Sequence, residues 1–341
     1  MGFPKPWPTE WPVPQRNPGR EVPSKKDKED TPPLAPGTEP PFPIPEYRRR
    51  FRAVTWAVNH ACNLRCTHCY DVVSFRRTDL NTKQALALID RLQEAGVEFI
   101  AFSGGEAFLR KDLFQLMEHS RKRGMQIGAR SNGTRITIDA ARKLKELEAS
   151  VVGVSFDGAC KETHDCVRGH GAFQSALAGI EALIAAGVRA QIEVVLSRQN
   201  MHEALDFIKL GESIGASEVN FSAMTPNGRG RERMEDLLDH ATWRHMTDSL
   251  REASKAASIP VTPNCALVGT CVANIEPHVT CDGWMSPCYL STVKLFPVLE
   301  TPAAEIRRLL ERDRERYQDI CGRKAWLHGS PGRDIIPLSA I

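Results

Sequence analysis

The sequence predicts an α/β fold with a parallel central sheet, and three observations predict it. Short apolar runs of strand length alternate with stretches in which apolar residues recur every three or four positions, the helical period. A glycine ends several of these helical stretches, where a left-handed cap is favoured: Gly96, Gly124, Gly187 and Gly215. Strands that alternate with helices pair in parallel, because each helix carries the chain back across the sheet.

Six strands are expected within residues 53–222. In chain order they cover residues 53–58, 97–102, 125–129, 151–156, 188–195 and 218–221. Between them, Leu88, Ile89 and Leu92 mark one amphipathic helix, and a second helix carries Phe173, Leu177, Ile180 and Ile184. Six units are too few to close an eight-stranded barrel, and the ligand sites of such sheets gather at the carboxyl ends of the strands.

Composition limits the class of protein. The 341 residues are 41% hydrophobic, enough for a sizeable core, and their net charge of +3 is too small to indicate a nucleic-acid partner. No stretch approaches the roughly 18–20 apolar residues of a membrane-spanning helix, and the amino terminus lacks a secretion signal. Ten cysteines then favour metal ligands in a reducing cytoplasm over disulfides. We therefore expect a cytoplasmic protein without a membrane or nucleic-acid partner.

The chain is expected to divide into four segments. Residues 1–50 hold 14 of the 23 prolines and predict a disordered arm. Trp7 and Trp11 either stay in solution with this arm or anchor it to the core or to a partner. The other segments are the α/β part, a connecting helix and a cysteine-rich domain with a tail, over residues 51–235, 236–262 and 263–341.

The most informative motif follows the first strand, where Cys62, Cys66 and Cys69 have CxxxCxxC spacing. Three thiolates can hold three irons of a [4Fe–4S] cluster and leave the fourth iron open, as in catalytic metal sites. A zinc site is the alternative, with His60 or His68 as the fourth ligand. The spacing resembles the motif of the radical S-adenosylmethionine (SAM) superfamily. That resemblance implies a partial (β/α)6 barrel and a cluster that binds SAM and cleaves it, by one electron, to methionine and a 5′-deoxyadenosyl radical.

The resemblance also implies a SAM pocket at the strand ends. Gly104, Gly105 and Glu106 follow the second strand and resemble the family's GGEP motif, which binds the SAM amino group. Ala107 replaces the usual proline of that motif. An ordinary turn between a strand and a helix is the alternative.

Two further runs resemble family motifs. Ser131 and Asn132 follow the third strand and are candidates for the SAM carboxylate or ribose, or else form a simple Asn-Gly turn. Ser155, Asp157 and Arg168 resemble the SxDG…HDxxRG run of the SPASM branch, named for its subtilosin, pyrroloquinoline-quinone, sulfatase and mycofactocin maturases. This implies that the serine and the aspartate hold ribose hydroxyls or substrate, and that the arginine pairs with a carboxylate or clamps its loop. A weaker ribose candidate follows the fifth strand: Ser197.

A second group of cysteines lies near the carboxyl terminus. Its spacing resembles the first auxiliary-cluster framework of SPASM and twitch domains, which implies one auxiliary cluster, of [4Fe–4S] type, held by Cys265, Cys271, Cys288 and Cys321. Cys281 is an alternative to Cys265, and a zinc site or buried structural cysteines are the alternative to a cluster. Residues 279–288 also predict a β-hairpin, with Asp282-Gly283 as its turn and a subdomain of its own.

These motifs predict a radical SAM oxidoreductase that abstracts hydrogen from an unactivated carbon. The substrate is expected to be a cofactor or tetrapyrrole (haem-type) precursor. A ribosomally made peptide or protein is the alternative, and a non-enzymatic iron–sulfur electron carrier is a second one. A low-potential donor such as flavodoxin or ferredoxin is the expected partner.

The arginine-rich loop and two further cysteines can each be interpreted in two ways. The arginines of residues 226–231 either receive substrate carboxylates or form a solvated basic loop. Cys160 and Cys166 match no motif position and are expected to be small core residues, unless one of them meets the substrate.

Overall fold

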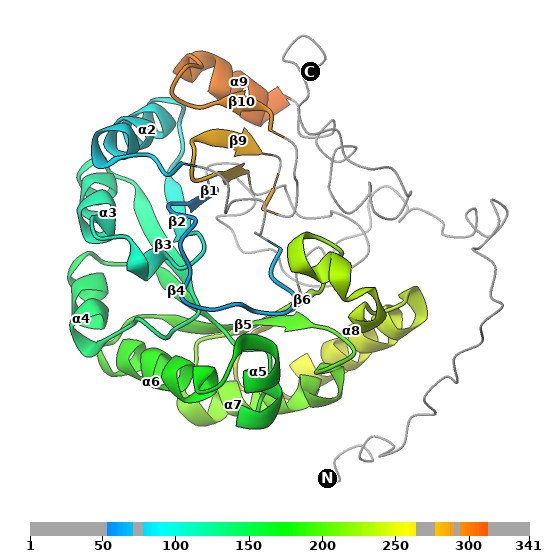
Figure 1. Cartoon of the computed structure of the whole chain (residues 1–341). Helices are drawn as coiled ribbons and strands as arrows, with labels where there is room; N and C mark the ends of the chain where they lie inside the picture. The colour runs from blue at the N-terminus through cyan, green and yellow to red at the C-terminus, as the bar shows by residue number, and fades with distance from the viewer. Residues whose placement is uncertain (1–52, 71–77, 264–276, 287, 290–293, 313–341) are drawn as a thin grey trace, which may run out of the picture. The chain divides into compact units, whose positions relative to one another are not determined.

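The computed structural model describes residues 53–70, 78–263, 277–286, 288–289 and 294–312, all within a unit that spans Phe42–Ile341. The predicted arm with Trp7 and Trp11 lies outside these residues, as do the predicted cluster ligands Cys265, Cys271 and Cys321. Figure 1 shows a curved sheet with α2, α3, α4, α6 and α7 on its outer side. Of the helices described, none combines the length and the apolar character that crossing a membrane requires.

The six predicted strands form, and each starts and ends within two residues of its predicted bounds. They are β1 (Ala53–Ala57), β2 (Phe99–Ser103), β3 (Gln126–Ser131), β4 (Val151–Ser155), β5 (Ala190–Leu196) and β6 (Val219–Ala223). Every neighbouring pair from β1 to β6 is parallel. The predicted α/β fold with an open, barrel-like parallel sheet is therefore confirmed.

The sheet extends beyond the six strands at both edges. β7 (Val261–Pro263) pairs in parallel with β6, and β8 (His278–Val279) pairs in parallel with β1. Strands this short carry no periodicity, so the sequence pattern missed them. The antiparallel strands β9 (Trp284–Ser286) and β10 (Phe296–Pro297) complete the order β10-β9-β8-β1-β2-β3-β4-β5-β6-β7.

The predicted hairpin is present as β8 and β9, and Gly283 takes φ +84° in its turn. Through β8 it joins the main sheet instead of standing apart, which differs from the separate subdomain expected for it. The domain boundaries at residues 50, 235 and 262 stay predictions.

The helices follow the predicted periodicity. They are α2 (Thr82–Glu94), α3 (Leu113–Lys122), α4 (Ile138–Glu146), α5 (Lys161–Arg168), α6 (Ala172–Ala185), α7 (Ala204–Ile214), α8 (His240–Ser254) and α9 (Ala303–Arg312). In α2, Leu88, Ile89 and Leu92 are fully buried, and the side chains of Asn81 and Gln84 form a capping box at its start. The four glycines predicted to end helices all have φ between +72° and +93°.

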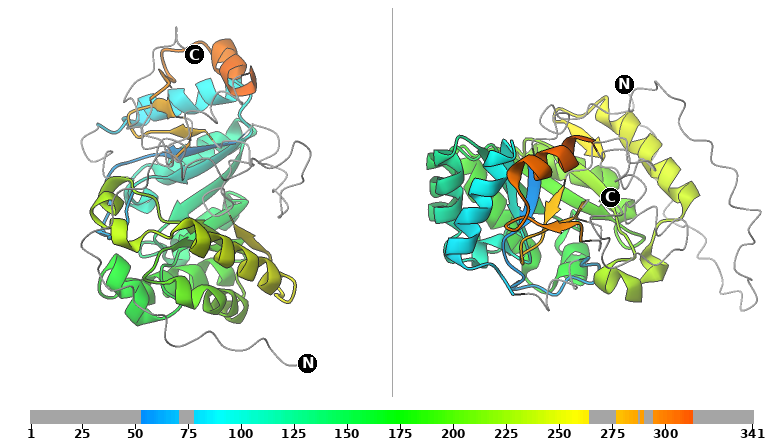
Figure 2. Two further views of the ribbon diagram at one scale, coloured as in Figure 1. Left: turned by 90° about the vertical axis from the view of Figure 1, so that its right-hand side faces the viewer. Right: turned by 90° about the horizontal axis from the view of Figure 1, so that it is seen from above.

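The last described helix packs beside the first one. α9 lies next to α2 in both Figure 1 and Figure 2. Arg307 of α9 donates to the carbonyls of Glu94 and Ala95 at 2.8 and 3.1 Å, and so caps the end of α2. Contacts between distant parts of the chain thus hold the outer layer over β1 and β2.

The inner face of the sheet changes from apolar to polar along the strands. Ala53, Phe99 and Ala101 pack together near the amino ends of β1 and β2. Two positions further along the same faces come Thr55 and Ser103, both of which line a pocket. The apolar layer therefore closes one end of the inner face and leaves polar groups at the carboxyl ends of the strands.

We predict that Gly179→Ala lowers the free energy of unfolding by about 1–3 kcal/mol, the cost of overpacking. Alanine normally favours a helix over glycine by about 1 kcal/mol. A Cβ at Gly179 of α6, however, would lie 2.2 Å from the carbonyl oxygen of Gly133, in the loop after β3. Chemical denaturation measures the change, with the exposed Gln174→Ala of the same helix as control. A stabilised Gly179→Ala protein would contradict this packing.

Candidate active site

A pocket lies at the carboxyl ends of the parallel strands, on the inner face of the sheet. Nine of the predicted cluster ligands and SAM contacts line it: Cys62, Cys66, Cys69, Gly104, Gly105, Ser131, Asn132, Ser155 and Arg168. They come from the segments that follow β1, β2, β3 and β4 and from the end of α5. Two other predicted residues, Glu106 and Asp157, are buried and do not line it.

The glycine pair permits a close contact with the start of the cysteine loop. Gly104 has φ +147°, and a Cβ there would lie 2.4 Å from Oδ1 of Asn59. A Cβ on Gly105 would lie 2.5 Å from the carbonyl oxygen of Ala61. Backbone hydrogen bonds from Gly105 to Asn59 (3.0 Å) and from Glu106 to Ala61 (2.8 Å) hold the two segments together. Only glycine allows this approach, which places the turn after β2 beside the cysteines.

The Glu106 carboxylate is buried between the ends of β2 and β3. It is 1% exposed and accepts hydrogen bonds from Ser131 Oγ (2.8 Å), the Asn132 backbone (2.7 Å) and the Phe108 backbone (3.1 Å). Burial raises its pKa, and these donors partly offset that rise. The side chain therefore joins the ends of β2 and β3, and its predicted contact with the SAM amino group stays a prediction.

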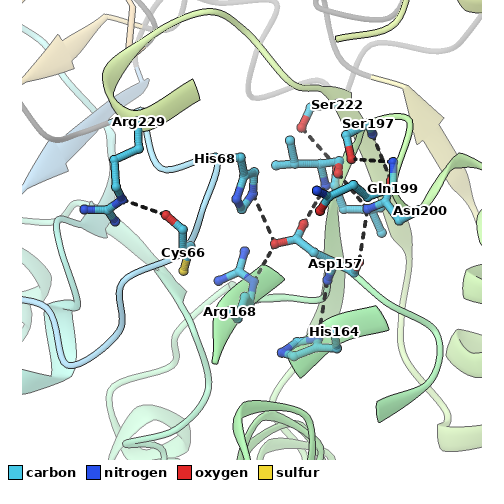
Figure 3. A network of polar contacts seen from close by, with 12 residues as sticks. Cys66, His68, Asp157, His164, Arg168, Ser197, Gln199, Asn200, Ser222 and Arg229 are labelled. Atoms are coloured by element: carbon cyan, nitrogen blue, oxygen red, sulfur yellow. Dashed lines mark hydrogen bonds and ion pairs between the residues drawn. The ribbon is translucent and has the colours of Figure 1, made fainter. Parts of the chain in front are cut away.

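Asp157 is the centre of a buried polar network (Figure 3). Its Oδ2 accepts from Nε of Arg168 at 2.5 Å and lies 3.1 Å from Nε2 of His68, while Oδ1 accepts from the Val195 backbone at 3.1 Å. Burial alone would raise its pKa, but the charge of Arg168 and the His68 contact hold it well below its usual range.

The Asp157 carboxylate is fully buried, and it positions Arg168 and His68 at the pocket wall. The expectation that Asp157 holds ribose or substrate stays a prediction. Arg168 clamps its loop through Asp157, which is one of the two roles weighed for it, and it also lines the pocket. Ser197 is buried beside this network, where its hydroxyl accepts from the Gln199 backbone at 3.2 Å, and it does not line the pocket.

The three motif thiols suit an iron–sulfur cluster. Burial raises the pKa of Cys62 and Cys66, so thiolates there need a positive partner. The Leu64 backbone and Asn132 Nδ2 point at the Cys62 sulfur at 3.4 and 3.9 Å, as donors around metal-bound thiolates do. Within the described residues, no three His, Cys, Asp or Glu side chains gather around one metal ion. A cluster makes no such demand, because each thiolate binds a different iron.

Sequence reasoning missed several residues of the pocket. Arg130 and Glu193 form an ion pair of 3.3 Å inside the sheet, across Gly153, where a Cβ would collide with the glutamate. Tyr70 packs against Tyr289 with ring centroids 5.5 Å apart. Only weak features of the sequence could have indicated these residues. They are the charged residues at inward positions of β3 and β5, and the tyrosines directly after Cys69 and Cys288.

The other cysteines differ in environment. Cys281 is fully buried, and Cys288 is half-buried beside Tyr289. Cys160 and Cys166 are exposed, so the prediction that they are core residues is wrong. The reason is the orientation of α5, which buries His164, Val167 and Arg168 and leaves Cys166 facing away.

Comparisons with known proteins agree with this geometry. The profile of the radical SAM superfamily matches residues 56–211. The AdoMet-dependent heme synthase of Oleidesulfovibrio alaskensis is 30% identical over 307 residues, which cover 80% of this chain and 79% of the synthase. The mycofactocin maturase MftC of Mycobacterium ulcerans is 34% identical over 186 residues, 54% of this chain and 50% of the maturase.

A solved structure has the same fold. Native anSMEcpe with bound AdoMet and the Kp18Cys peptide superposes with a TM-score of 0.63 over 78% of this chain and 82% of the other. Sequence identity is 19%, so this likeness speaks for the fold alone.

We predict a stability loss in mild acid that depends on His164. The ring is buried against Phe156 and Phe173, and burial, together with the charge of Arg168, lowers its pKa to about 4. An unfolded histidine has a pKa of about 6.5, so the unfolded chain binds more protons between pH 6.5 and 4. The folded state therefore loses about 3 kcal/mol as the pH falls through this window.

The variant His164→Phe should remove that loss, since it gives up only a long hydrogen bond of 3.4 Å from the Asp157 backbone. Urea denaturation at several pH values measures the slope. The exposed His202→Gln serves as control and should keep the wild-type slope. Equal slopes for wild type and His164→Phe would refute the assignment.

Proposed function

This chain belongs to the radical SAM superfamily, in its SPASM/twitch branch, and from that membership we propose that it modifies a tetrapyrrole of the haem type. It is an enzyme, and its family uses SAM with a [4Fe–4S] cluster. The proposed reaction abstracts a hydrogen atom from an unactivated carbon of an iron tetrapyrrole precursor. Three motif thiols and the glycine pair in one pocket are the observation that supports SAM chemistry at this site.

The pocket residues divide into cluster ligands and SAM contacts. Cys62, Cys66 and Cys69 would hold three irons, and the backbone of Gly104 and Gly105 would meet the amino end of SAM. The remaining contacts, to the carboxylate and the ribose, are proposed for Ser131, Asn132, Ser155 and Arg168. When bound, the cluster supplies the electron that cleaves SAM to methionine and the 5′-deoxyadenosyl radical.

Several of these contacts are fixed in place by buried partners. Glu106 fixes the hydroxyl of Ser131 and the backbone of Asn132, and Asp157 fixes the guanidinium of Arg168. A pocket whose polar groups are already oriented need not reorganise when SAM binds. Such a pocket also has few mobile groups with which a radical could react.

The extent of the sequence match supports a tetrapyrrole substrate. The heme synthase aligns over 80% of this chain, well past the barrel residues matched by the family profile. The mycofactocin maturase aligns over 54%, although with the higher identity of 34%. This second match is the reason to keep a second candidate, a maturase acting on a ribosomally made peptide.

We also propose one auxiliary cluster on the cysteines near the carboxyl terminus. Cys288 would be one ligand, with Cys265, Cys271 and Cys321 as the others, and Cys281 as the alternative to the first of these. The contact of Tyr70 with Tyr289 supports this, because it places the neighbour of Cys288 against the neighbour of Cys69. A low-potential flavodoxin or ferredoxin is the proposed electron donor.

We predict that Cys66→Ala removes about half of the roughly eight irons of the reconstituted wild type and abolishes 5′-deoxyadenosine formation. Iron analysis and product chromatography under anaerobic conditions measure both. Cys166→Ala is the matched control, because that thiol is exposed and should leave both quantities unchanged. Unchanged SAM cleavage in Cys66→Ala would contradict the proposed SAM chemistry.

For the substrate, we predict that the wild type converts Fe-coproporphyrin III, used as a haem-type probe, with one 5′-deoxyadenosine formed per hydrogen abstracted. Cys288→Ala should keep SAM binding and some SAM cleavage without probe, because Cys288 does not line the pocket, but lose turnover of the probe. Mass spectrometry follows the products, and circular dichroism checks that the variant is folded. A wild type that ignores the probe but modifies a precursor peptide would favour the peptide alternative. Normal turnover by folded Cys288→Ala would remove the auxiliary cluster from the reaction.

A further inference from the structure

The turn that carries two of the motif cysteines is held at both ends by one residue of a distant loop. Arg229, in the 3-10 turn η5 (Gly228–Glu232) after β6, donates from Nε to the carbonyl of Cys66 at 2.7 Å. Its backbone donates to the carbonyl of Cys69 at 2.9 Å. The Cys66 carbonyl also accepts from the Cys69 backbone at 3.3 Å, which closes the turn. Arg229 therefore ties the first and last residues of the turn together, and Figure 3 shows its contact with Cys66.

The neighbouring glycine makes this contact possible. Gly228 has φ +54°, and a Cβ there would lie 2.3 Å from the carbonyl oxygen of Cys69 and 2.7 Å from that of Tyr70. The loop after β6 thus lies directly against the backbone of the cysteine turn. No other residue type would allow this approach with that backbone conformation.

The opposite side of the turn is held by α5 and by the loop after β4. Thr67 donates its backbone N–H to the carbonyl of Val167 at 3.0 Å, and His68 contacts the carboxylate of Asp157 at 3.1 Å. On the other side, Arg229 holds the turn through its two hydrogen bonds, and its side chain also lines the pocket. The direction in which Cys66 and Cys69 point therefore depends on contacts from two separate parts of the barrel.

The guanidinium also brings a permanent positive charge to the turn. The Arg229 Nε lies 2.7 Å from the Cys66 carbonyl oxygen, and the Arg229 side chain lines the same pocket as the three motif thiols. A cation that favours a thiolate also favours an added electron on a cluster bound to that thiolate, since both add negative charge. Hydrogen bonds and charges around the ligands are known determinants of cluster potential.

We propose that Arg229 is a positioning residue for the SAM-binding cluster, which holds the Cys66–Cys69 turn in its ligating conformation and makes reduction of the cluster easier. This rests on the proposed function, because it takes those cysteines as cluster ligands. It replaces both readings given to the arginine from the sequence, a receptor for substrate carboxylates and a solvated surface residue. It also separates Arg229 from Arg231, which is exposed and, among the described residues, donates to the nearby Pro226 carbonyl at 3.3 Å.

Three variants test the proposal: Arg229→Met, which removes charge and donor, Arg229→Lys, which keeps the charge, and Arg231→Met as the matched control. In the cluster-free protein, we expect Arg229→Met and Arg229→Lys to speed amide hydrogen exchange in residues 66–70. After reconstitution, Arg229→Met should bind iron roughly 10–100-fold more weakly, the usual effect of losing a partner of a metal ligand.

The reduction potential of the cluster distinguishes the effect of the Arg229 charge from the effect of its hydrogen bond. In a redox titration followed by electron paramagnetic resonance, Arg229→Met should be reduced only at a more negative potential, and Arg229→Lys should recover most of the wild-type value. Arg231→Met should match the wild type in all three measurements. If Arg229→Met is too unstable to bind the cluster, Arg229→Lys still tests the proposal. A wild-type reduction potential together with faster amide exchange in Arg229→Lys supports it.

Two results would overturn the idea in different ways. If the wild type binds a cluster but Arg229→Met keeps the wild-type exchange rates and potential, Arg229 has no positioning role and the proposed function stands. If the wild type binds no iron at Cys62, Cys66 and Cys69, the proposed function itself fails.

Discussion

The buried carboxylate of Asp157 is the interaction on which the rest of the site depends. An unpaired charge in that position would be costly, but here Arg168, His68 and the Val195 backbone all contact it. Those three partners belong to a helix end, to the cysteine loop and to β5. One carboxylate therefore fixes the relative positions of the motif cysteines and two strand ends. Glu106 does the same for β2 and β3.

The two carboxylates show how much of a motif's role can be structural. Both belong to sequence runs that resemble SAM-binding motifs, and both are buried and do not line the pocket. The groups that these carboxylates hold in place do line the pocket. They are the hydroxyl of Ser131, the backbone of Asn132 and the guanidinium of Arg168. An essential residue in such a motif can thus act entirely through its neighbours.

Sequence alone predicted the parts of the fold that have a clear period. The six strands, the helix faces and the glycine caps follow from apolar spacing and from the backbone freedom of glycine, and the cysteines and the Gly104-Gly105 turn follow from local motifs. What it missed depends on contacts between distant segments. β7 and β8 are too short to show a pattern, the exposure of Cys166 depends on how α5 is rotated, and the contact of Arg229 with Cys66 spans 163 positions. No local rule relates residues so far apart.

That separation has a consequence for biosynthesis. The cysteines leave the ribosome long before the residues that shape their turn: Asp157 and Arg168 follow about a hundred residues later, and Arg229 lies 163 residues after Cys66. At about 5–20 residues per second, roughly 8–33 seconds of translation separate Cys66 from Arg229. During that interval the nascent thiols lack their ligating geometry and are exposed to oxidants and stray metal ions. If these cysteines hold a cluster as proposed, we expect its assembly to follow closure of the barrel.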